Sequence, residues 1–341
     1  MFEPMAAGGL SARGWRSRPL LWRATLWACF ALIVAVAWGL VAAGPILDGW
    51  ARALSSGVKA DLLTGGPRGY VEAGLGTAAW FALLVGRPLA ILAVVMAVEI
   101  ALVGPPRSWS RSCFFMLMQA IIASLFYFLN PWLQMVLPVG ELGALVRVEM
   151  QHLPALLAPL GNFFLIVLVF LLHGLAGYWV HRAQHEIPFL WRFHAVHHAI
   201  EDMEAMGDVS HPFDAIGDRI GVILIGLLVG VNYEGIAWII AVRSGAGRLI
   251  HSRAPINFGK LGWLFVDNRF HFTHHSVREK YFDRNYGGVF TIYDRLFGTY
   301  VAPDGDALEV TGMPSKLPAR TVTQFLLARL DDRPAAPAET R

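Results

Sequence analysis

Cysteine is scarce in this chain: only Cys29 and Cys113 occur among 341 residues, both inside apolar stretches. They lack the paired spacing of zinc and iron–sulfur motifs, so we expect two buried, reduced thiols. Charged residues are also scarce, at 16% of the chain, against about 25% in ordinary soluble domains. Because the net charge is only +3 and no basic run stands out, we expect no nucleic-acid partner.

Hydrophobic residues make up 55% of the chain, and this excess predicts a membrane protein. The first apolar run, residues 24–43, is too long for the core of a signal peptide and predicts a retained transmembrane helix. Arg16, Arg18 and Arg23 precede this run, so the positive-inside rule places the N-terminus in the cytoplasm.

A second apolar stretch, residues 74–103, is interrupted at Arg87-Pro88, so we expect an interfacial or partly inserted piece followed by a helix over 89–103. Two further stretches, 112–137 and 161–180, predict helices that span the membrane. A last stretch, 215–250, carries Asn232-Tyr233-Glu234 at its middle. We interpret it as a hairpin that dips into the membrane and returns, keeping the histidines before and after it on one side. The predicted fold is all-α: a polytopic membrane helical bundle of about four spans plus this hairpin, capped by a cytoplasmic, histidine-rich helical domain.

Histidine is concentrated in one part of the chain: of twelve histidines, all but His152 and His173 lie between residues 181 and 275. Eight of them form three short motifs, which are His181/His185, His194/His197/His198 and His271/His274/His275. The spacings of three and four residues place side chains on one face of a helix. We therefore expect each motif to direct its imidazoles in one direction.

The number of imidazoles indicates two metal ions. Eight rings exceed the four ligands that zinc usually takes, and they suit two ions with open positions. Imidazole binds iron, zinc, copper and nickel. Iron is the ion we expect, because activation of O2 for attack on an alkyl C–H bond needs a redox metal. The carboxylates that are candidates to orient these histidines are Glu186, Glu201, Asp202, Asp267 and Asp294.

The motifs and their surroundings resemble the fatty acid hydroxylase/sterol desaturase superfamily over residues 170–302. The segments that carry this likeness are Tyr178–His185 (YWVHRAQH), Pro188–His198 (PFLWRFHAVHH), Arg269–Ser276 (RFHFTHHS) and Tyr281–Tyr300 (YFDRNYGGVFTIYDRLFGTY). The resemblance implies a helical membrane domain under a cytoplasmic cap, two iron ions with zinc as a substitute, and O2 as co-substrate. One departure is Gly174, near which many members carry an Asp, and we expect the adjacent His173 to substitute.

The resemblance also assigns roles to individual histidines. The implied catalytic and metal-binding set is His181, His185, His194, His197, His198, His271, His274 and His275. His251 is added as a further ligand, since members commonly carry an extra histidine there. His211 is either a ligand or a residue that orients one.

The implied domain plan has four parts. They are a cytoplasmic N-terminal segment (1–19), transmembrane helices and loops (20–160), a fatty acid hydroxylase-like catalytic domain (161–318), and a C-terminal helix over 320–330 with a disordered tail (319–341 together). We expect a multi-pass protein of a bacterial inner membrane, with the catalytic site on the cytoplasmic side.

The function that these observations favour is O2-dependent hydroxylation of a membrane lipid, such as a fatty acyl chain or a sterol. Electrons are expected from a separate protein, a ferredoxin or a cytochrome and its reductase, because the chain has no Gly-rich dinucleotide fingerprint and no cysteine cluster. The alternatives are lipid desaturation at the same site, a non-oxidative zinc-dependent membrane enzyme, a metal transporter and an inactive homologue. Transport is disfavoured because charged residues and histidines are nearly absent from the predicted spans.

Overall fold

The structure is a computed structural model that describes residues 92–119, 121–122, 158–217, 225, 243, 245–254 and 256–334. The chain divides into two compact units, 1–105 and 106–341. The described part of the first unit is residues 92–105, which are helical over 92–103. The predicted span 24–43 and the predicted hairpin tip at Asn232-Tyr233-Glu234 lie outside the described residues. The predicted domain boundaries stay predictions, and the second unit contains all the histidine motifs.

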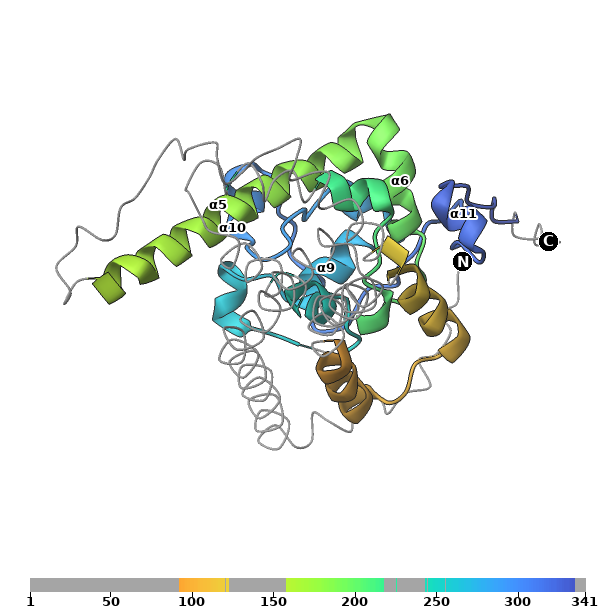
Figure 1. The fold of residues 1–341 in the computed structure, drawn as a ribbon, viewed down its shortest axis with the longest axis horizontal. Coiled ribbons are helices and arrows are strands. Elements are labelled where there is room, and N and C mark those ends of the chain that lie inside the picture. Colours follow the sequence, from red (N-terminus) through yellow and green to blue (C-terminus); the bar gives the residue numbers. More distant parts are fainter. Residues whose placement is uncertain are drawn as a thin grey trace, which may run out of the picture. The chain divides into compact units, whose positions relative to one another are not determined.

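The longest helix in the described part of the second unit is α5, Ala158–Glu186. It contains the predicted span 161–180 and continues without a break through the first histidine motif. Its end has a local cause. Pro188 disfavours helical geometry at the residue before it, and Ile187 is accordingly extended, with φ −99° and ψ 113°. Pro188 then opens helix α6, Pro188–His198, which packs back against α5 (Figure 1).

The remaining labelled elements are short and lie between long loops. They are η2 (Ala205–Gly207), η3 (Gly259–Trp263), α9 (Asn268–His274), η4 (Glu279–Tyr281), α10 (Ile292–Leu296) and α11 (Val322–Leu326). Residues 109–119, 212–217 and 245–251 add further helical segments. In the described residues β pairing is limited to isolated bridges, which agrees with the predicted all-α class.

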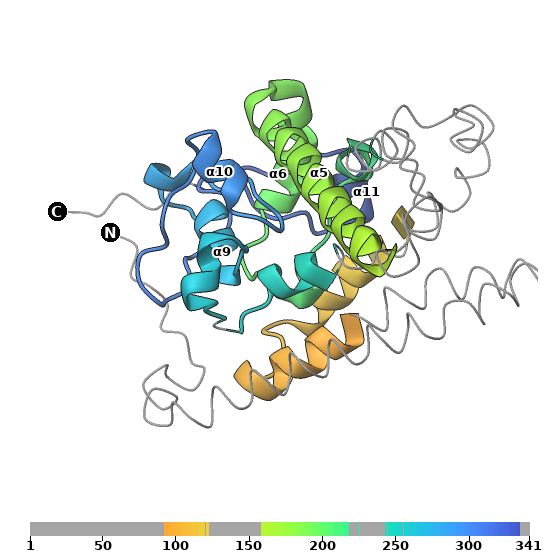
Figure 2. The ribbon, with the colours of Figure 1, turned by 90° about the vertical axis from the view of Figure 1, so that its left-hand side faces the viewer.

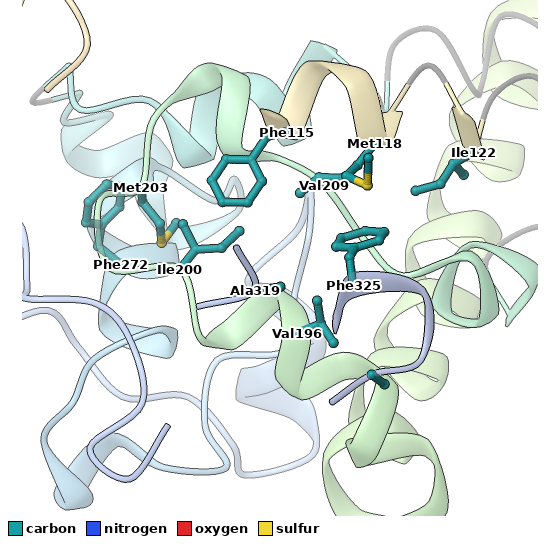
Figure 3. Packing of buried hydrophobic residues seen from close by; sticks show 11 residues of the cluster. Phe115, Met118, Ile122, Val196, Ile200, Met203, Val209, Phe272, Ala319 and Phe325 are labelled. Atoms are coloured by element: carbon teal, nitrogen blue, oxygen red, sulfur yellow. The ribbon is translucent and has the colours of Figure 1, made fainter. Parts of the chain in front are cut away.

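An apolar core lies on one side of α6 (Figure 3). Val196 of α6 packs there with Phe115 and Met118 of the helical segment 109–119, and with Phe325 of α11. On a helix of about 100° per residue, positions 194 and 198 lie nearly opposite Val196. The core therefore fixes the rotation of α6 and turns His194 and His198 to the other side.

Cys113, in the helical segment 109–119, differs from the expectation of two buried thiols. Cys113 is a free, exposed cysteine, so the expectation is wrong for this residue. It lies about 200° around the helix from Phe115, which faces the core. Apolar neighbours in the sequence therefore do not imply that the Cys113 side chain is buried. Cys29 lies outside the described residues.

A second, aromatic cluster attaches the 286–297 segment to α5. Tyr178 of α5 packs with Tyr286, Phe290 and Tyr293, and the Tyr293 hydroxyl donates a 2.6 Å hydrogen bond to the carbonyl oxygen of Leu171. Helix α10 accordingly lies against α5 in both views (Figures 1 and 2). This packing brings the loop before α10 over the histidine end of α5.

The predicted C-terminal helix is shorter in the structure than expected, and the predicted membrane-spanning helices stay predictions. The predicted helix 320–330 is present only as α11, Val322–Leu326, because Ala328 takes φ 48°, outside the helical region. Thr321 and Gln324 cap the start of α11 reciprocally. Among the residues that the structure describes, no helix has both the length and the apolar character needed to cross a membrane. The membrane spans remain predictions.

Candidate metal centre

Nine histidines converge in two groups that we name A and B. Group A consists of His181, His185, His194, His198 and His274, and group B consists of His197, His251, His271 and His275. Within each group the ligand nitrogens all lie within 4.8 Å of one another. All eight residues of the three sequence motifs are therefore brought together, and His251 joins them.

The two H-x-x-H-H motifs divide between the groups. His194 and His198 enter group A while His197 enters group B, and His271 and His275 enter group B while His274 enters group A. Residues four apart differ by about 40° around a helix, whereas neighbours differ by about 100°. The expectation that each motif directs all its rings in one direction is therefore wrong for these two motifs. It holds for His181 and His185, which are four residues apart and both in group A.

Hydrogen bonds at Nδ1 turn the other ring nitrogen of several histidines inward. Nδ1 of His181 lies 2.7 Å from the carbonyl oxygen of Tyr286, and Nδ1 of His274 lies 2.7 Å from that of Arg284. In group B, Nδ1 of His197 is 3.0 Å from the Val209 carbonyl, and Nδ1 of His251 is 2.6 Å from the Gly247 carbonyl. A carbonyl only accepts, so each Nδ1 carries the proton and each Nε2 presents a lone pair.

The inward nitrogens lie closer than two lone pairs tolerate without a cation. Nε2 of His197 and Nε2 of His251 are 3.1 Å apart, although both are acceptors because each Nδ1 carries the proton. The Nε2 atoms of His181 and His194 are also 3.1 Å apart, and Nδ1 of His194 faces the Asp214 carboxylate at 3.4 Å. Two nitrogens bound side by side at about 2.1 Å from one ion lie about 3 Å apart. The spacing therefore fits metal ligation.

Burial favours the neutral form of several histidines in the two groups. It lowers the pKa of His197 to about 4. Burial, followed by the charge of neighbouring imidazoles, holds the pKa of His198, His274 and His275 well below the usual range. Neutral imidazole is the form that binds metal.

Several buried nitrogens lack any other partner. Among the described residues, Nε2 of His274 and both ring nitrogens of His275 have no hydrogen bond. Leaving a buried polar atom unpaired costs about 1–3 kcal/mol. A metal ion in each group would engage Nε2 of His274 and one ring nitrogen of His275, and the all-nitrogen set of five and four imidazoles fits iron or zinc.

Comparison with known proteins agrees with this geometry. Residues 166–299 match the family model "Fatty acid hydroxylase". Over this segment the chain is similar to the fatty acid hydroxylase/sterol desaturase superfamily. The family resemblance predicted from the histidine motifs is thereby confirmed. No solved structure matches the chain significantly.

The curated relatives that this chain resembles are named as enzymes that act on lipids. It is 31% identical over 155 residues to ornithine lipid hydroxylase OlsE of Rhizobium tropici, covering 45% of this chain and 47% of the relative. It is 29% identical over 134 residues to human alkylglycerol monooxygenase, covering 37% and 28%. It is 25% identical over 192 residues to Delta(7)-sterol 5(6)-desaturase erg32 of Schizosaccharomyces pombe, covering 50% and 52%. These matches span about half or less of each relative's length.

The carboxylates nearest the histidines are not those expected from the sequence. Asp214 faces His194, Asp283 lies 3.3 Å from Nδ1 of His185, and Asp208 lies 3.6 Å from Nδ1 of His251. No spacing in the sequence connects these acids to their histidines, because the loops between them set the distances. The five expected carboxylates bond instead to other groups.

Those other groups are mostly cations and backbone. Glu186 pairs with Arg182, Glu201 with Arg333, and Asp202 with Arg107 and Arg111. Asp267 caps α9 by accepting from the backbone N–H of Phe270. Asp294 is different, because it acts on a histidine through one intermediate. It accepts from the backbone N–H of Tyr286 at 2.7 Å, and the carbonyl of Tyr286 is the acceptor for His181.

Two of the other predicted histidines lie apart from the groups. His211 belongs to neither group: its Nε2 lies 3.2 Å from the Leu326 carbonyl, and its Nδ1 accepts from the backbone N–H of Phe213. It thus connects to the end of α11 rather than to a ligand. His173 is buried but also belongs to neither group. A Cβ on the adjacent Gly174 would lie 2.8 Å from the Phe290 ring, so an Asp cannot take that position without a shift.

Proposed function

We propose that this protein is an O2-dependent di-iron hydroxylase that acts on a C–H bond of a membrane lipid. The observation that carries the proposal is the pair of adjoining, all-imidazole groups, buried at seven of their nine histidines, with inward lone pairs about 3 Å apart. Relatives that are lipid hydroxylases and monooxygenases support the substrate class. His181, His185, His194, His198 and His274 would hold one iron, and His197, His251, His271 and His275 would hold the other.

The protein's own residues prepare the site in three ways. The outward Nδ1 bonds fix each ring's tautomer and orientation, so that the ligands are in place before an ion arrives. Burial shields all four histidines of group B, and three of the five of group A, from water. The ring of Tyr286 covers group A, with its centroid 5.2 Å from that of His185 and 6.0 Å from that of His274.

When bound, two irons supply the redox chemistry that activates O2. In the overall hydroxylation, one oxygen atom enters the C–H bond and the other leaves as water, which requires two electrons and two protons. A separate donor, a ferredoxin or a cytochrome and its reductase, would deliver the electrons. The scarcity of cysteine and the lack of a dinucleotide fingerprint support an external source.

Desaturation is the second candidate reaction on the same groups. A sterol desaturase among the relatives favours it. The two reactions share the removal of a hydrogen atom and differ in whether oxygen or a second hydrogen loss follows. A zinc-dependent, non-oxidative enzyme is the remaining alternative, because the same imidazoles bind zinc.

The geometry also supports a membrane arrangement. Helix α6 and helix α9 both contribute to group A and to group B. The segments that carry them must therefore lie on one side of any membrane, which favours a returning path for residues 215–250. The proposal keeps the multi-pass arrangement, with both groups at the cytoplasmic boundary, where a lipid can enter sideways from the bilayer.

Metal content and turnover on one preparation test the proposal. Protein purified in detergent and reconstituted with Fe2+ under anaerobic conditions should bind about two irons per chain. With a reductase system, O2 and bacterial lipid extract, mass spectrometry should show a lipid that gains one oxygen atom. His274→Ala should lose this product. Folded protein without stoichiometric metal would overturn the metal site, and an iron-loaded enzyme that modifies no lipid in the presence of electrons would overturn the hydroxylase.

A further inference from the structure

A surface cavity of about 260 Å3 lies between η3 and the segment that follows α10. Its lining includes Lys260, Trp263, Asp267, Arg269, Arg295 and Tyr300. None of the nine histidines of groups A and B is in this lining. The cavity is therefore separate from the proposed catalytic site.

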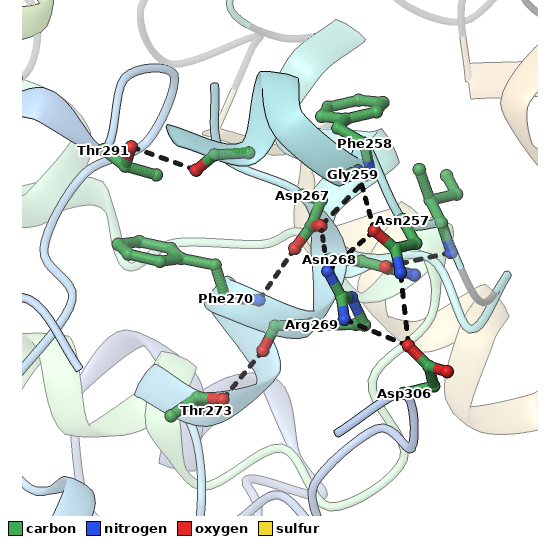
Figure 4. A network of polar contacts seen from close by, with 12 residues as sticks. Asn257, Phe258, Gly259, Asp267, Asn268, Arg269, Phe270, Thr273, Thr291 and Asp306 are labelled. Carbon is green, nitrogen blue, oxygen red and sulfur yellow. Dashed lines mark hydrogen bonds and ion pairs between the residues drawn. The ribbon is translucent and has the colours of Figure 1, made fainter. Parts of the chain in front are cut away.

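The cavity has an excess of positive charge. Three cationic side chains and one carboxylate line it. The carboxylate, Asp267, already accepts from Arg269 at 3.0 Å and from the backbone N–H of Phe270 at 3.1 Å. Arg269 also bonds to Asn257 and Asp306, so its positive charge is already partnered (Figure 4). Lys260 and Arg295 are the cations left without a counter-charge in the described structure.

The guanidinium group of Arg295 is fixed in position, and its two terminal nitrogens are available to bind a ligand. Its guanidinium carbon lies 3.6 Å from the centroid of the Tyr300 ring, and its Nε donates to the carbonyl oxygen of Trp263 at 3.3 Å. These two contacts fix the plane of the guanidinium group. Its two terminal nitrogens have no partner among the described residues, and they form a fork that matches the oxygens of a phosphate. Lys260 is exposed at the same cavity and adds a second charge.

Large apolar side chains surround this charge. Leu261 is 59% exposed, Trp263 58% and Leu296, next to Arg295, 70%. A binding site for a free, water-soluble anion does not require exposed leucine side chains beside it. Cations, a tryptophan and exposed aliphatic side chains together are typical of a surface that lies in the lipid headgroup region.

We propose that Lys260 and Arg295 bind the phosphate of an anionic phospholipid headgroup, while Leu261, Trp263 and Leu296 enter the acyl region beside it. The charge of the cavity complements that lipid, and the apolar side chains distinguish it from a soluble phosphate. This site does not depend on the proposed hydroxylase chemistry, because it shares no residue with groups A and B. It would hold η3 and α10 at the membrane surface.

Calorimetric titration of the full-length protein in neutral detergent tests the site. The probes are dihexanoyl-phosphatidylglycerol, dihexanoyl-phosphatidylcholine and inorganic phosphate. Wild type should bind the phosphatidylglycerol most tightly. Lys260→Gln/Arg295→Gln should weaken that binding roughly thirtyfold, because each cation near anionic lipid contributes about fivefold. Arg320→Gln/Arg329→Gln removes the same charge from exposed positions outside the cavity and should bind as wild type.

Each other result decides against the site. Equal losses in the two double variants would show a general charge effect, and equal binding of the two phospholipids would remove the role of Lys260 and Arg295. Phosphate bound as tightly as phosphatidylglycerol would show an anion site without lipid. Iron content on the same samples separates these results from failure of the catalytic site. Should the double variant not fold, Lys260→Gln alone is expected to weaken binding by about fivefold.

Discussion

The rings of His198 and His275 stack with their centroids 4.1 Å apart and their planes 15° apart. His198 belongs to group A and His275 to group B, so this stack is a direct contact between the two groups. Each ring is the second member of an adjacent His-His pair. The two ions proposed for this protein would therefore be close neighbours but would have separate ligands.

Separate ligands predict that the groups lose metal independently. His274→Ala removes a ligand of group A and His271→Ala one of group B. Each variant should fall from about two irons per chain to about one, measured by elemental analysis, because the remaining group keeps all its imidazoles. His211→Ala, which lies outside both groups, should keep the wild-type content. Loss of both irons in each variant would show a single shared site.

Asp214 is expected to tune group A more strongly than group B, because it contacts His194 directly and acts on His197 only through its charge. Its carboxylate contacts Nδ1 of His194 and also accepts from Gln184. In Asp214→Asn the amide no longer favours the proton on Nδ1, so metal affinity of group A should fall roughly 10- to 100-fold. Competition with a chelator of known affinity measures this. Asp202→Asn is the matched control, since Asp202 pairs only with Arg107 and Arg111 in the described structure. Equal affinities in both variants would exclude the role of Asp214.

Asp294 is predicted to position His181 without touching it. One carboxylate accepts from the backbone N–H groups of Tyr286 and Gly287 and from the Thr299 hydroxyl, at 2.7, 2.8 and 2.7 Å. Asp294→Asn cannot accept all three, which should cost about 1–3 kcal/mol and loosen the Tyr286 carbonyl.

The measured consequence should be weaker iron binding in group A with group B intact, together with a lower Tm. Asp304→Asn, which removes an exposed carboxylate in the same part of the chain, serves as control. A lower Tm with unchanged iron affinity would assign Asp294 a structural role only.

Gly174 and Gly177 form a matched pair on α5. A Cβ at Gly174 would lie 2.8 Å from the Phe290 ring, whereas one at Gly177 would meet nothing closer than the Arg243 guanidinium at 3.6 Å. Gly174→Ala should lower stability by about 1–3 kcal/mol through overpacking, seen as a lower Tm in detergent. Gly177→Ala should be near neutral or stabilising, since alanine favours helix. The reverse order would contradict the packing of Phe290 on α5.

The shared groups predict the topology of the two halves of the catalytic domain. Cysteines placed at Arg192 and at Lys280, in a variant without Cys29 and Cys113, should react alike with a membrane-impermeant thiol reagent. Both should be labelled in inverted vesicles and protected in intact cells, because both segments are proposed to face the cytoplasm. Opposite labelling of the two positions would contradict the joint histidine groups and the returning hairpin.

The sequence by itself determined the family resemblance, the helical class and ten ligand candidates, of which the structure brings all but His211 into the two groups. Histidines spaced three and four apart fix a helical face locally, and α5, α6 and α9 form where these motifs lie. The sequence could not assign these histidines to two groups, because the two adjacent histidines of each H-x-x-H-H motif lie about 100° apart around the helix. Only the packing of Val196 into the apolar core fixes which ring points where on α6.

The residues that orient the ligands were decided by tertiary structure alone. Asp214 and the Tyr286 carbonyl are distant in sequence from the histidines that they contact. Every residue has a backbone carbonyl, so the residue type does not indicate which carbonyl accepts from a histidine. Ring spacing is a local property that 3.6 residues per turn encodes, whereas hydrogen bonds between distant segments depend on how loops pack. The sequence therefore determined which residues are candidates to bind metal, and the fold decided which of them lie together.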